Sequence, residues 1–219
     1  MSLFITMEGP EGGGKTTQSR LLAEHLRSLG NDVLLTREPG GTPIGEQIRA
    51  VLGSLDNTDM HPRTEFLLFS SSRAQLVRQV IQPHLDRGGL VVCDRFFDSS
   101  LAYQGFGHRL DLQQLRTITD FAVGGIAPDL TLLLDIPVEE GLRRREKSGS
   151  RNRLDDYDVA FHRRVRKGYQ QLAAADPHRW VRIDASGPPD KVQEEVRRVV
   201  EARLRDMRQE RGTSGGPGR

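Results

Sequence analysis

A short segment near the start of the chain carries residues whose types and spacing fit phosphate chemistry. Gly9 to Thr16 reads Gly-Pro-Glu-Gly-Gly-Gly-Lys-Thr and matches the P-loop pattern G-x-x-x-x-G-K-[ST] at every fixed position. In this pattern backbone N–H groups surround a polyphosphate, the lysine reaches its β- and γ-phosphates, and the hydroxyl ligates Mg²⁺. The segment therefore predicts an ATP or GTP site with Lys15 and Thr16 in these roles.

The loop glycines are predicted to let the phosphates approach the backbone, because glycine has no Cβ and tolerates positive φ. The alternative is a glycine-rich turn that only joins a strand to a helix. An apolar strand pattern, Leu3 to Met7, precedes the loop and a helical pattern begins at Lys15, which favours nucleotide binding. The predicted ATP-binding residues are Gly9, Pro10, Glu11, Gly12, Gly13, Gly14, Lys15, Thr16 and Thr17.

Two further strand patterns end in charged side chains. Val33 to Thr36 is followed by Arg37-Glu-Pro-Gly-Gly-Thr42, and Leu90 to Asp94 is followed by Arg95. Because ligands of open α/β sheets bind beyond the carboxyl ends of strands, Arg37 is a candidate for phosphate contact and Asp94 for an acid near the metal. An ordinary turn with a surface ion pair explains the Arg37 segment equally well at this stage.

A long helical pattern from Pro62 to Asp86 presents an aromatic ring beside a guanidinium. Phe69 and Arg73 are four residues apart and share one helix face. Together they suit a planar base, which stacks on the ring and accepts a hydrogen bond from the guanidinium at an exocyclic oxygen. Local context favours a plainer interpretation, in which Phe69 belongs to the core and Arg73 is solvated.

Polar residues fill the segment Phe97 to Gly107, which is predicted as a glycine-punctuated helix and loop. Ser99, Ser100, Tyr103 and Gln104 can all form hydrogen bonds, which few core helices offer. The segment is therefore a candidate wall of a polar site.

An arginine-rich segment, about 143–157, is predicted to be a mobile lid. Ser148-Gly-Ser150 interrupts a helical pattern there, with arginines on both sides. Closure of such a lid over ATP would bring guanidinium groups onto the transferring phosphate. The alternatives are a solvated cationic helix and a nucleic-acid patch, the latter weaker because few aromatic residues interleave the basic ones.

Composition narrows the class of protein. The length of 219 residues suits one domain over 1–208, followed by a tail, 209–219, that is predicted to be disordered. The net charge of +2 gives no reason to expect a nucleic-acid partner. A single cysteine, Cys93, excludes an intramolecular disulfide and suits a reducing cytoplasm. No apolar run has the length of a membrane span, and the N-terminus is predicted as a core strand instead of a signal peptide.

Alternation of buried strand patterns with helical patterns predicts the fold. Strands are expected at 3–7, 33–36, 90–94, 130–135 and 180–183, and helices at 15–29, 43–52, 62–86, 112–123, 137–145 and 189–207. Buried apolar strands joined by helical crossovers form parallel sheets. The expected fold is an α/β domain with a five-stranded parallel sheet and helices on both faces.

Three segments, taken with the P-loop, resemble the thymidylate kinases over nearly the whole chain, about Leu3 to Leu204. They are Arg37-Glu-Pro-Gly-Gly-Thr42, Phe69-Ser-Ser-Ser-Arg73 and Asp94-Arg-Phe-Phe-Asp-Ser-Ser-Leu-Ala-Tyr-Gln104. The resemblance implies a P-loop nucleoside-monophosphate-kinase fold and a homodimer. It also implies phosphoryl transfer from MgATP to dTMP, which gives dTDP and ADP for dTTP synthesis.

The resemblance further implies a role for each acceptor-site residue. Phe69 would stack on thymine and Arg73 would bond its O4, which reverses the local interpretation above. Tyr103, with Gln104 beside it, would crowd the sugar 2′ position and so favour deoxyribose. The other implied contacts are Ser100 to the base N3 edge, Glu11 to the 3′-hydroxyl, Arg37 and Arg95 to the dTMP phosphate, and Asp94 to the metal and that phosphate. Ser99, in the same segment, is included in the predicted substrate-binding set.

The P-loop contains no arginine, so the chain resembles the bacterial type of the family, whose catalytic arginines lie in the lid. Arg151 and Arg153 are the leading candidates, ahead of Arg143 and Arg144. Similar proteins often carry Asp-Arg-x-Glu after the lid, and this chain departs from that pattern with Asn152-Arg-Leu-Asp155. The predicted catalytic residues are Lys15, Asp94, Arg95, Arg151 and Arg153, and the predicted Mg²⁺ ligands are Thr16 and Asp94.

Three rival functions would each differ from this one in a recognisable way. A kinase for another monophosphate or a deoxynucleoside would differ at positions 69, 73, 100 and 103. A GTPase-like switch needs an Asn/Thr-Lys-x-Asp stretch, which the sequence lacks. A nucleic-acid-stimulated ATPase would use the basic lid as a binding patch and would show a steep salt dependence.

Overall fold

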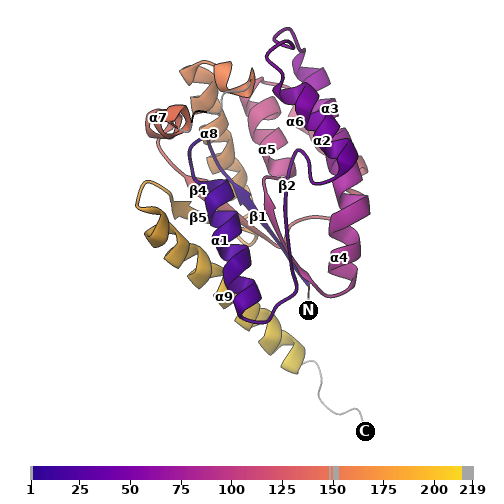
Figure 1. Ribbon diagram of the computed structural model, residues 1–219, viewed down its shortest axis with the longest axis vertical. Coiled ribbons are helices and arrows are strands. Elements are labelled where there is room, and N and C mark those ends of the chain that lie inside the picture. The colour runs from indigo at the N-terminus through magenta and orange to yellow at the C-terminus, as the bar shows by residue number, and fades with distance from the viewer. Residues whose placement is uncertain (1, 148, 150–152, 214–219) are drawn as a thin grey trace.

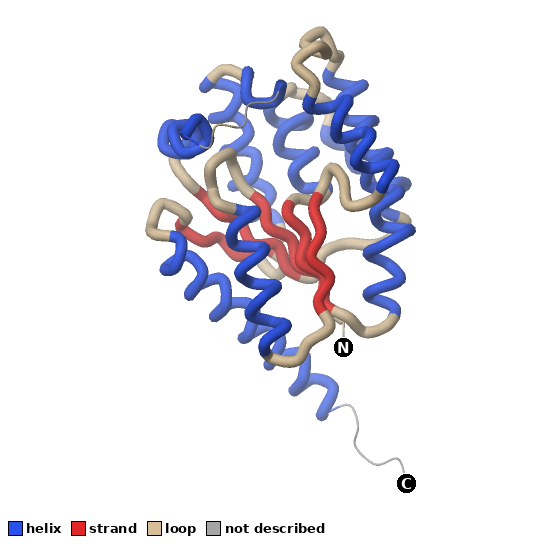
Figure 2. Tube along the Cα trace, viewed as in Figure 1, coloured by secondary structure: helices blue, strands red, loops and turns tan. Residues whose placement is uncertain are grey.

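A central parallel sheet with helices on both faces organises the chain (Figures 1 and 2). The computed structural model describes residues 2–147, 149 and 153–213. Within these residues the strands are β1 (Leu3–Glu8), β2 (Val33–Arg37), β3 (Leu90–Asp94), β4 (Leu130–Asp135) and β5 (Trp180–Asp184). They form one sheet in the order β2-β3-β1-β4-β5, and every neighbouring pair is parallel. The predicted five-stranded parallel sheet is therefore confirmed.

Helical segments connect and cover the strands. They are α1 (Lys15–Ser28), α2 (Pro43–Gly53), α3 (Pro62–Leu76), η1 (Val77–Ile81), α4 (Gln82–Asp86), α5 (Phe97–Ser100), η2 (Leu101–Gly107), α6 (Leu112–Val123), α7 (Val138–Lys147), η3 (Arg153–Asp156), α8 (Val159–Ala175) and α9 (Pro189–Thr213). The segment predicted as one helix from 62 to 86 contains a π-helical turn, η1, directly before α4. Pro83 lacks an N–H to donate, and such interruptions are where helices widen or bend.

Strand β1 shows how the sheet divides the core into two layers. Its side chains alternate, as in any strand. Leu3 and Met7 are fully buried in the cluster that contains residues of α1 and α9. Phe4 points to the other face and packs edge-on against Phe96, with ring centroids 5.0 Å apart. Because both faces of the sheet are packed, the strand ends have fixed positions, and so do the first residues of the loops that follow them.

The carboxyl ends of β1, β2 and β3 meet at one edge of the sheet. Asp94, the last residue of β3, is in register with Met7 of β1 on one side and Arg37 of β2 on the other. The P-loop follows β1 directly, and helices α2, α3, α5 and α7 stand over the same edge (Figure 1). The fold therefore brings three separate sequence motifs together at one place.

The C-terminal helix corrects one prediction. Helix α9 extends to Thr213, whereas residues from 209 onward were predicted to be disordered. The segment Arg208-Gln-Glu-Arg211 consists of good helix formers, and the first glycine after it is at position 212, so the helix continues past 208. The rest of that predicted tail, 214–219, lies outside the described residues. Among the helices that are described, none has the length and apolar character needed to cross a membrane.

Candidate active site

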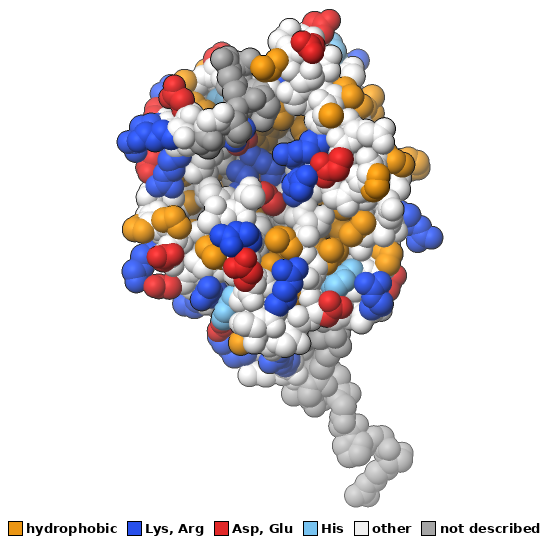
Figure 3. Space-filling model, in the orientation of Figure 1, with side chains coloured by type: hydrophobic (Ala, Val, Ile, Leu, Met, Phe, Trp, Pro, Cys, Tyr) orange, Lys and Arg blue, Asp and Glu red, His pale blue; other side chains and the backbone are white. Residues whose placement is uncertain are grey.

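A cavity of about 790 Å³ opens over the carboxyl ends of β1, β2 and β3. Basic side chains gather around this hollow on the face shown in Figure 3. Most of the sequence-predicted site residues line it: Glu11, Gly12, Gly14, Lys15, Thr16, Thr17, Arg37, Phe69, Asp94, Arg95, Ser99, Ser100, Tyr103 and Gln104. The fold thus brings most of the predicted nucleotide-binding and acceptor-binding residues together in one cavity.

The P-loop glycines serve two different purposes. Gly14 has a φ of +81°, and a Cβ built there would meet no described atom within 4 Å, so it faces open space where phosphates can approach. A Cβ on Gly9 would instead lie 2.4 Å from the Leu134 carbonyl oxygen, and one on Gly12 would lie 2.0 Å from the Gly141 carbonyl oxygen. The sequence interpretation, phosphate access at every glycine, is therefore corrected. Gly9 and Gly12 let the loop pack against β4 and α7.

Lys15 lies at the start of α1, and its side chain folds back along the P-loop. Its Nζ donates to the carbonyl oxygens of Gly9 (3.0 Å) and Pro10 (2.7 Å). Burial and the positive charge of Arg95 lower the pKa of Lys15 to about 8. An incoming polyphosphate would relieve both effects, because it would surround the ammonium with negative charge.

Thr16 and Asp94 are adjacent, which fits the predicted metal site. The Thr16 hydroxyl donates to Asp94 Oδ2 at 2.5 Å. Both side chains reach the cavity, and both supply the hard oxygen ligands that Mg²⁺ prefers. Within the described residues no group of three or more His, Cys, Asp or Glu could hold a metal ion. This pair therefore suits Mg²⁺ that keeps waters and nucleotide phosphates as its other ligands.

Arg95 crosses the middle of the cavity. Its Nη2 donates to Glu11 Oε1 at 2.7 Å and to the Tyr103 hydroxyl at 3.3 Å. Tyr103 also donates to Glu11 Oε1, at 2.7 Å. Burial raises the pKa of Glu11, but the charges of Arg95 and Lys15 outweigh it and hold that pKa at about 2. Glu11 is thus a carboxylate at neutral pH, and it links the P-loop to both predicted acceptor residues.

Arg73 is fully buried behind the cavity wall, contrary to the local expectation that it would be solvated. Its Nε donates to Glu38 Oε2 at 3.0 Å, and its Nη2 donates to Glu38 Oε1 and, at 2.8 Å, to the Ser100 hydroxyl. Among the described residues its Nη1 has no hydrogen-bond partner. A buried donor without an acceptor costs free energy, so a ligand carbonyl beside it would be favoured. Phe69 lines the cavity from the same helix, one turn away.

Two more arginines stand near the end of β2. Half-exposed Arg37 donates through Nη2 to both oxygens of Glu46, at 2.8 and 2.9 Å. Arg49, on α2, donates to the Pro39 carbonyl oxygen at 2.9 Å and also lines the cavity. Burial and the positive charge of Arg37 lower the pKa of Arg49. Two cations held this close favour an anion between them.

The arrangement of P-loop, acid, arginines and aromatic residues agrees with a comparison against protein families. A model of the thymidylate kinase family matches residues 7–196. The chain belongs to the thymidylate kinase family. The protein is therefore a nucleoside-monophosphate kinase. Its five-stranded parallel sheet with surrounding helices is the P-loop kinase fold.

Individual relatives agree over almost their full length. The thymidylate kinase of Deinococcus radiodurans is 51% identical over 202 residues, covering 92% of this chain and 97% of that protein. That of Thermomicrobium roseum is 53% identical over 197 residues, covering 90% and 93%. The crystal structure of thymidylate kinase from Ehrlichia chaffeensis is similar with a TM-score of 0.75 and 34% identity, covering 91% of this chain and 98% of that one.

Arg153 of the kinase does not reach the cavity, which corrects its sequence interpretation as a leading catalytic arginine. It is buried, and its Nη2 donates to Glu65 Oε2 at 2.5 Å, with further bonds to the Tyr157 hydroxyl and the Leu52 carbonyl oxygen, both at 3.1 Å. Glu65 also accepts from Gln104 at 2.7 Å. Glu65 is fully buried, and a buried carboxylate is stable only with donors such as these. The Arg153 guanidinium is therefore held at Glu65 and not in the cavity.

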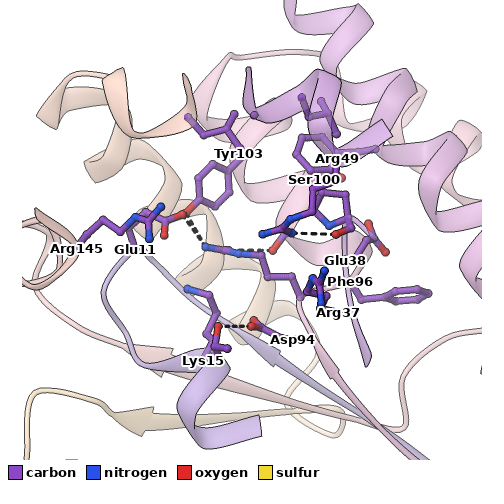
Figure 4. A pocket seen from close by; sticks show the side chains of 18 of the residues that line it. Glu11, Lys15, Arg37, Glu38, Arg49, Asp94, Phe96, Ser100, Tyr103 and Arg145 are labelled. Atoms are coloured by element: carbon purple, nitrogen blue, oxygen red, sulfur yellow. Dashed lines mark hydrogen bonds and ion pairs between the residues drawn. The ribbon is translucent and has the colours of Figure 1, made fainter. Parts of the chain in front are cut away.

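The other lid arginines divide in their placement. Arg151 lies outside the described residues. Arg143 is exposed on α7 and does not line the cavity. Arg144 lines it, but its guanidinium donates to Glu140 and to the carbonyl oxygens of Ala185 and Ser186. Arg145 of the kinase also lines the cavity, extends toward Glu11 (Figure 4), and its charge helps to lower the Glu11 pKa.

The sequence does not single out Arg49, Arg145 or Glu38 as site residues of the kinase, although Arg145 belongs to the predicted arginine-rich lid. A weak signal existed for Arg49, because it follows Glu46 by three residues and so shares a helix face with it. Glu38 was treated only as the ion-pair partner of Arg37, its neighbour in sequence. Its actual partner, Arg73, is 35 residues away, a separation that no local pattern reveals.

Proposed function

We propose that this site transfers the γ-phosphoryl group of ATP to the 5′-phosphate of dTMP, giving dTDP and ADP. One observation carries the proposal. A single cavity holds the P-loop and Lys15 on one side and Arg37, Arg95 and Phe69 on the other. A donor polyphosphate and an acceptor nucleotide can therefore meet within one cavity, which is the main requirement for direct transfer.

The acceptor half suits a thymine deoxynucleotide. Phe69 offers a ring face for stacking from the cavity wall. Arg73 is fully buried and does not line the cavity; it is linked to the acceptor half by its bond to Ser100, and its Nη1 has no partner among the described residues. Tyr103 is buried, and its hydroxyl is tied to Glu11, so its ring cannot easily withdraw from the sugar 2′ side. Ser99, Ser100 and Gln104 complete the polar wall of this half.

Transfer follows an in-line displacement. An oxygen of the dTMP phosphate attacks the γ-phosphorus, and the bond from that phosphorus to the ADP oxygen breaks. The acceptor is already an anion, so no strong general base is required. Lys15 and Arg95 neutralise charge on the two reactants and hold them in line. Thr16 and Asp94 would hold Mg²⁺, which when bound neutralises the β- and γ-phosphates.

Arg145 is the lid arginine that best fits transition-state stabilisation. It lies on the cavity wall beside Glu11. A guanidinium there can reach charge that develops on the equatorial oxygens of the transferring group. Arg151 keeps its sequence-based candidacy, because its segment lies outside the described residues.

The rate of ADP release with different acceptors tests the proposed function. A coupled assay would use MgATP with dTMP, dUMP, dCMP, dGMP, UMP or no acceptor. We expect ADP release to require a nucleotide and to be fastest with dTMP, with weak dUMP and negligible UMP turnover, because Phe69, Arg73 and Tyr103 select base and sugar. A rate of ADP release that is the same with every nucleotide and with none would contradict the proposal and favour an ATPase.

A homodimer is also part of the proposal. Large apolar side chains are exposed on α2, α3 and α6: Ile44 at 50%, Val51 at 45%, Leu67 at 50% and Phe121 at 89%. Helix α3 packs against both α2 and α6, so the three helices that carry these side chains are neighbours. Large apolar side chains exposed on neighbouring helices favour association with a second copy.

The single buried Cys93 suits a cytoplasmic location, which is proposed on that basis.

Light scattering measures the predicted dimer. We expect twice the 24.5 kDa chain mass at micromolar concentration and the monomer mass for Phe121→Asp, because a charge in the contact would be desolvated. Asp120→Asn, a change of charge on a neighbouring exposed residue of the same helix, is the control and should leave the dimer intact. A monomer mass for the unchanged protein would refute the dimer.

A further inference from the structure

Two hydroxyl groups, those of Ser99 and Tyr169, hold one edge of the Arg95 guanidinium. Its Nη1 donates to Ser99 Oγ at 3.2 Å, to the Tyr169 hydroxyl oxygen at 3.3 Å, and to the Gly9 carbonyl oxygen at 3.2 Å. Tyr169 comes from α8 and is fully buried, so it touches Arg95 from the protein side and not from the cavity. The Nη2 edge, in contrast, faces the cavity residues described above.

Glu8 stands behind both hydroxyls and sets where their protons point. Its Oε2 accepts from Ser99 Oγ at 2.6 Å and from the Tyr169 hydroxyl at 2.9 Å, while its Oε1 accepts from the Phe96 backbone N–H at 2.7 Å. A guanidinium can only donate hydrogen bonds. The hydroxyl protons must therefore point away from Arg95, toward Glu8 or along the 2.8 Å contact between Ser99 and Tyr169. Their oxygen lone pairs remain for Arg95.

The backbone gives Arg95 little other support for its orientation. Its φ is +70°, the left-handed region that few residues with side chains adopt, and its N–H donates to the Met7 carbonyl oxygen at 3.0 Å. These features fix the start of a long side chain, but an arginine has several further rotatable bonds whose ordering costs entropy. Contacts at the guanidinium itself are what keep the far end in place before a ligand arrives.

We propose that Tyr169, with Glu8 behind it, is a positioning residue that holds the Arg95 guanidinium ready for the acceptor phosphate. The inference rests on the proposed function, in which Arg95 contacts the dTMP phosphate. Glu8 and Tyr169 never touch the substrate in this scheme. Their effect reaches it only through Arg95, so it should depend on the presence of a phosphate in the ligand.

Titration calorimetry with dTMP and with thymidine, which lacks the phosphate, tests this dependence. Tyr169→Phe keeps the ring in the core and removes the oxygen that Arg95 bonds. We expect it to weaken dTMP binding about tenfold, the size of one hydrogen bond to a charged group, and to leave thymidine binding unchanged. Burial and the charge of Asp98 raise the pKa of Glu8 to about 7, so the titration is run at about pH 8, where Glu8 is a carboxylate.

A second variant and a matched control complete the test. Glu8→Gln presents an amide donor to hydroxyls that need an acceptor, so it should also lower the dTMP affinity selectively. Tyr157→Phe removes a hydroxyl from a different carboxylate, Glu65, and should leave the ratio of dTMP to thymidine affinity unchanged. Equal weakening of both ligands, or of neither, in Tyr169→Phe would overturn the inference. If the unchanged protein binds dTMP and thymidine equally, the phosphate role of Arg95 fails, and this inference with it.

Discussion

Lys15→Met should lower kcat by about 10³-fold and leave dTMP affinity within about threefold, because it removes one preorganised cation from the transferring phosphate. Methionine keeps the unbranched stem that packs along the loop. Only the contacts to the carbonyl oxygens of Gly9 and Pro10 are lost from the fold, and these face a cavity where water can replace them. The loss should therefore appear in the chemical step and not in folding.

Initial-rate kinetics and a thermal melt separate the two effects for this variant. Lys191→Met is a suitable control, because Lys191 is exposed on α9 and only pairs with Glu194 three residues on. The control should retain the wild-type kcat. A kcat for Lys15→Met within tenfold of wild type would remove Lys15 from the transfer step.

Arg153→Met should destabilise the fold by about 3–5 kcal/mol, the cost of breaking a buried ion pair, and lower Tm by about 10 °C. The reason is Glu65, which is fully buried and would lose the guanidinium that bonds it. Burial raises the pKa of Glu65, but hydrogen bonds from His108, Arg153 and Gln104 outweigh it and hold that pKa at about 2. Without Arg153, a buried charged carboxylate would lose one of the donors that stabilise it, and the folded state would be less stable. The kcat of the folded variant should fall less than tenfold.

A second substitution checks this explanation of Arg153. Adding Glu65→Gln to Arg153→Met removes the stranded charge and keeps an acceptor for Gln104, so the double variant should be more stable than Arg153→Met alone. Differential scanning calorimetry would measure both. A loss of about 10³-fold in kcat with an unchanged Tm would instead restore the sequence interpretation, in which Arg153 acts on the transferring phosphate.

The strands could be predicted from sequence because a parallel sheet buried on both faces produces continuous apolar runs. Leu132 to Leu134 is such a run, and every residue of β4 is buried. The π-helical turn at Val77–Ile81 left no comparable signal, since its residues fit an ordinary helix. The end of α9 differs from the prediction, because the Gly- and Arg-rich composition of 209–219 as a whole indicates disorder, whereas its first residues are good helix formers.

The site could be predicted where its residues are adjacent in sequence. The P-loop is a contiguous motif, and Asp94 and Arg95 are consecutive residues at the end of β3. Contacts between distant segments could not be predicted. Arg153 and Glu65 are 88 residues apart, and only the packing of η3 against α2, the neighbour of α3, reveals that the Glu65 carboxylate bonds this arginine.

The fate of the γ-phosphorus tests the central claim, direct transfer between two nucleotides in one cavity. ³¹P NMR of the enzyme with MgATP and dTMP would follow it. We expect the γ-phosphorus lost from ATP to appear as the β-phosphorus of dTDP, with negligible orthophosphate. Orthophosphate released at the same rate with and without dTMP would contradict the claim, because it would show that water, and not dTMP, is the acceptor.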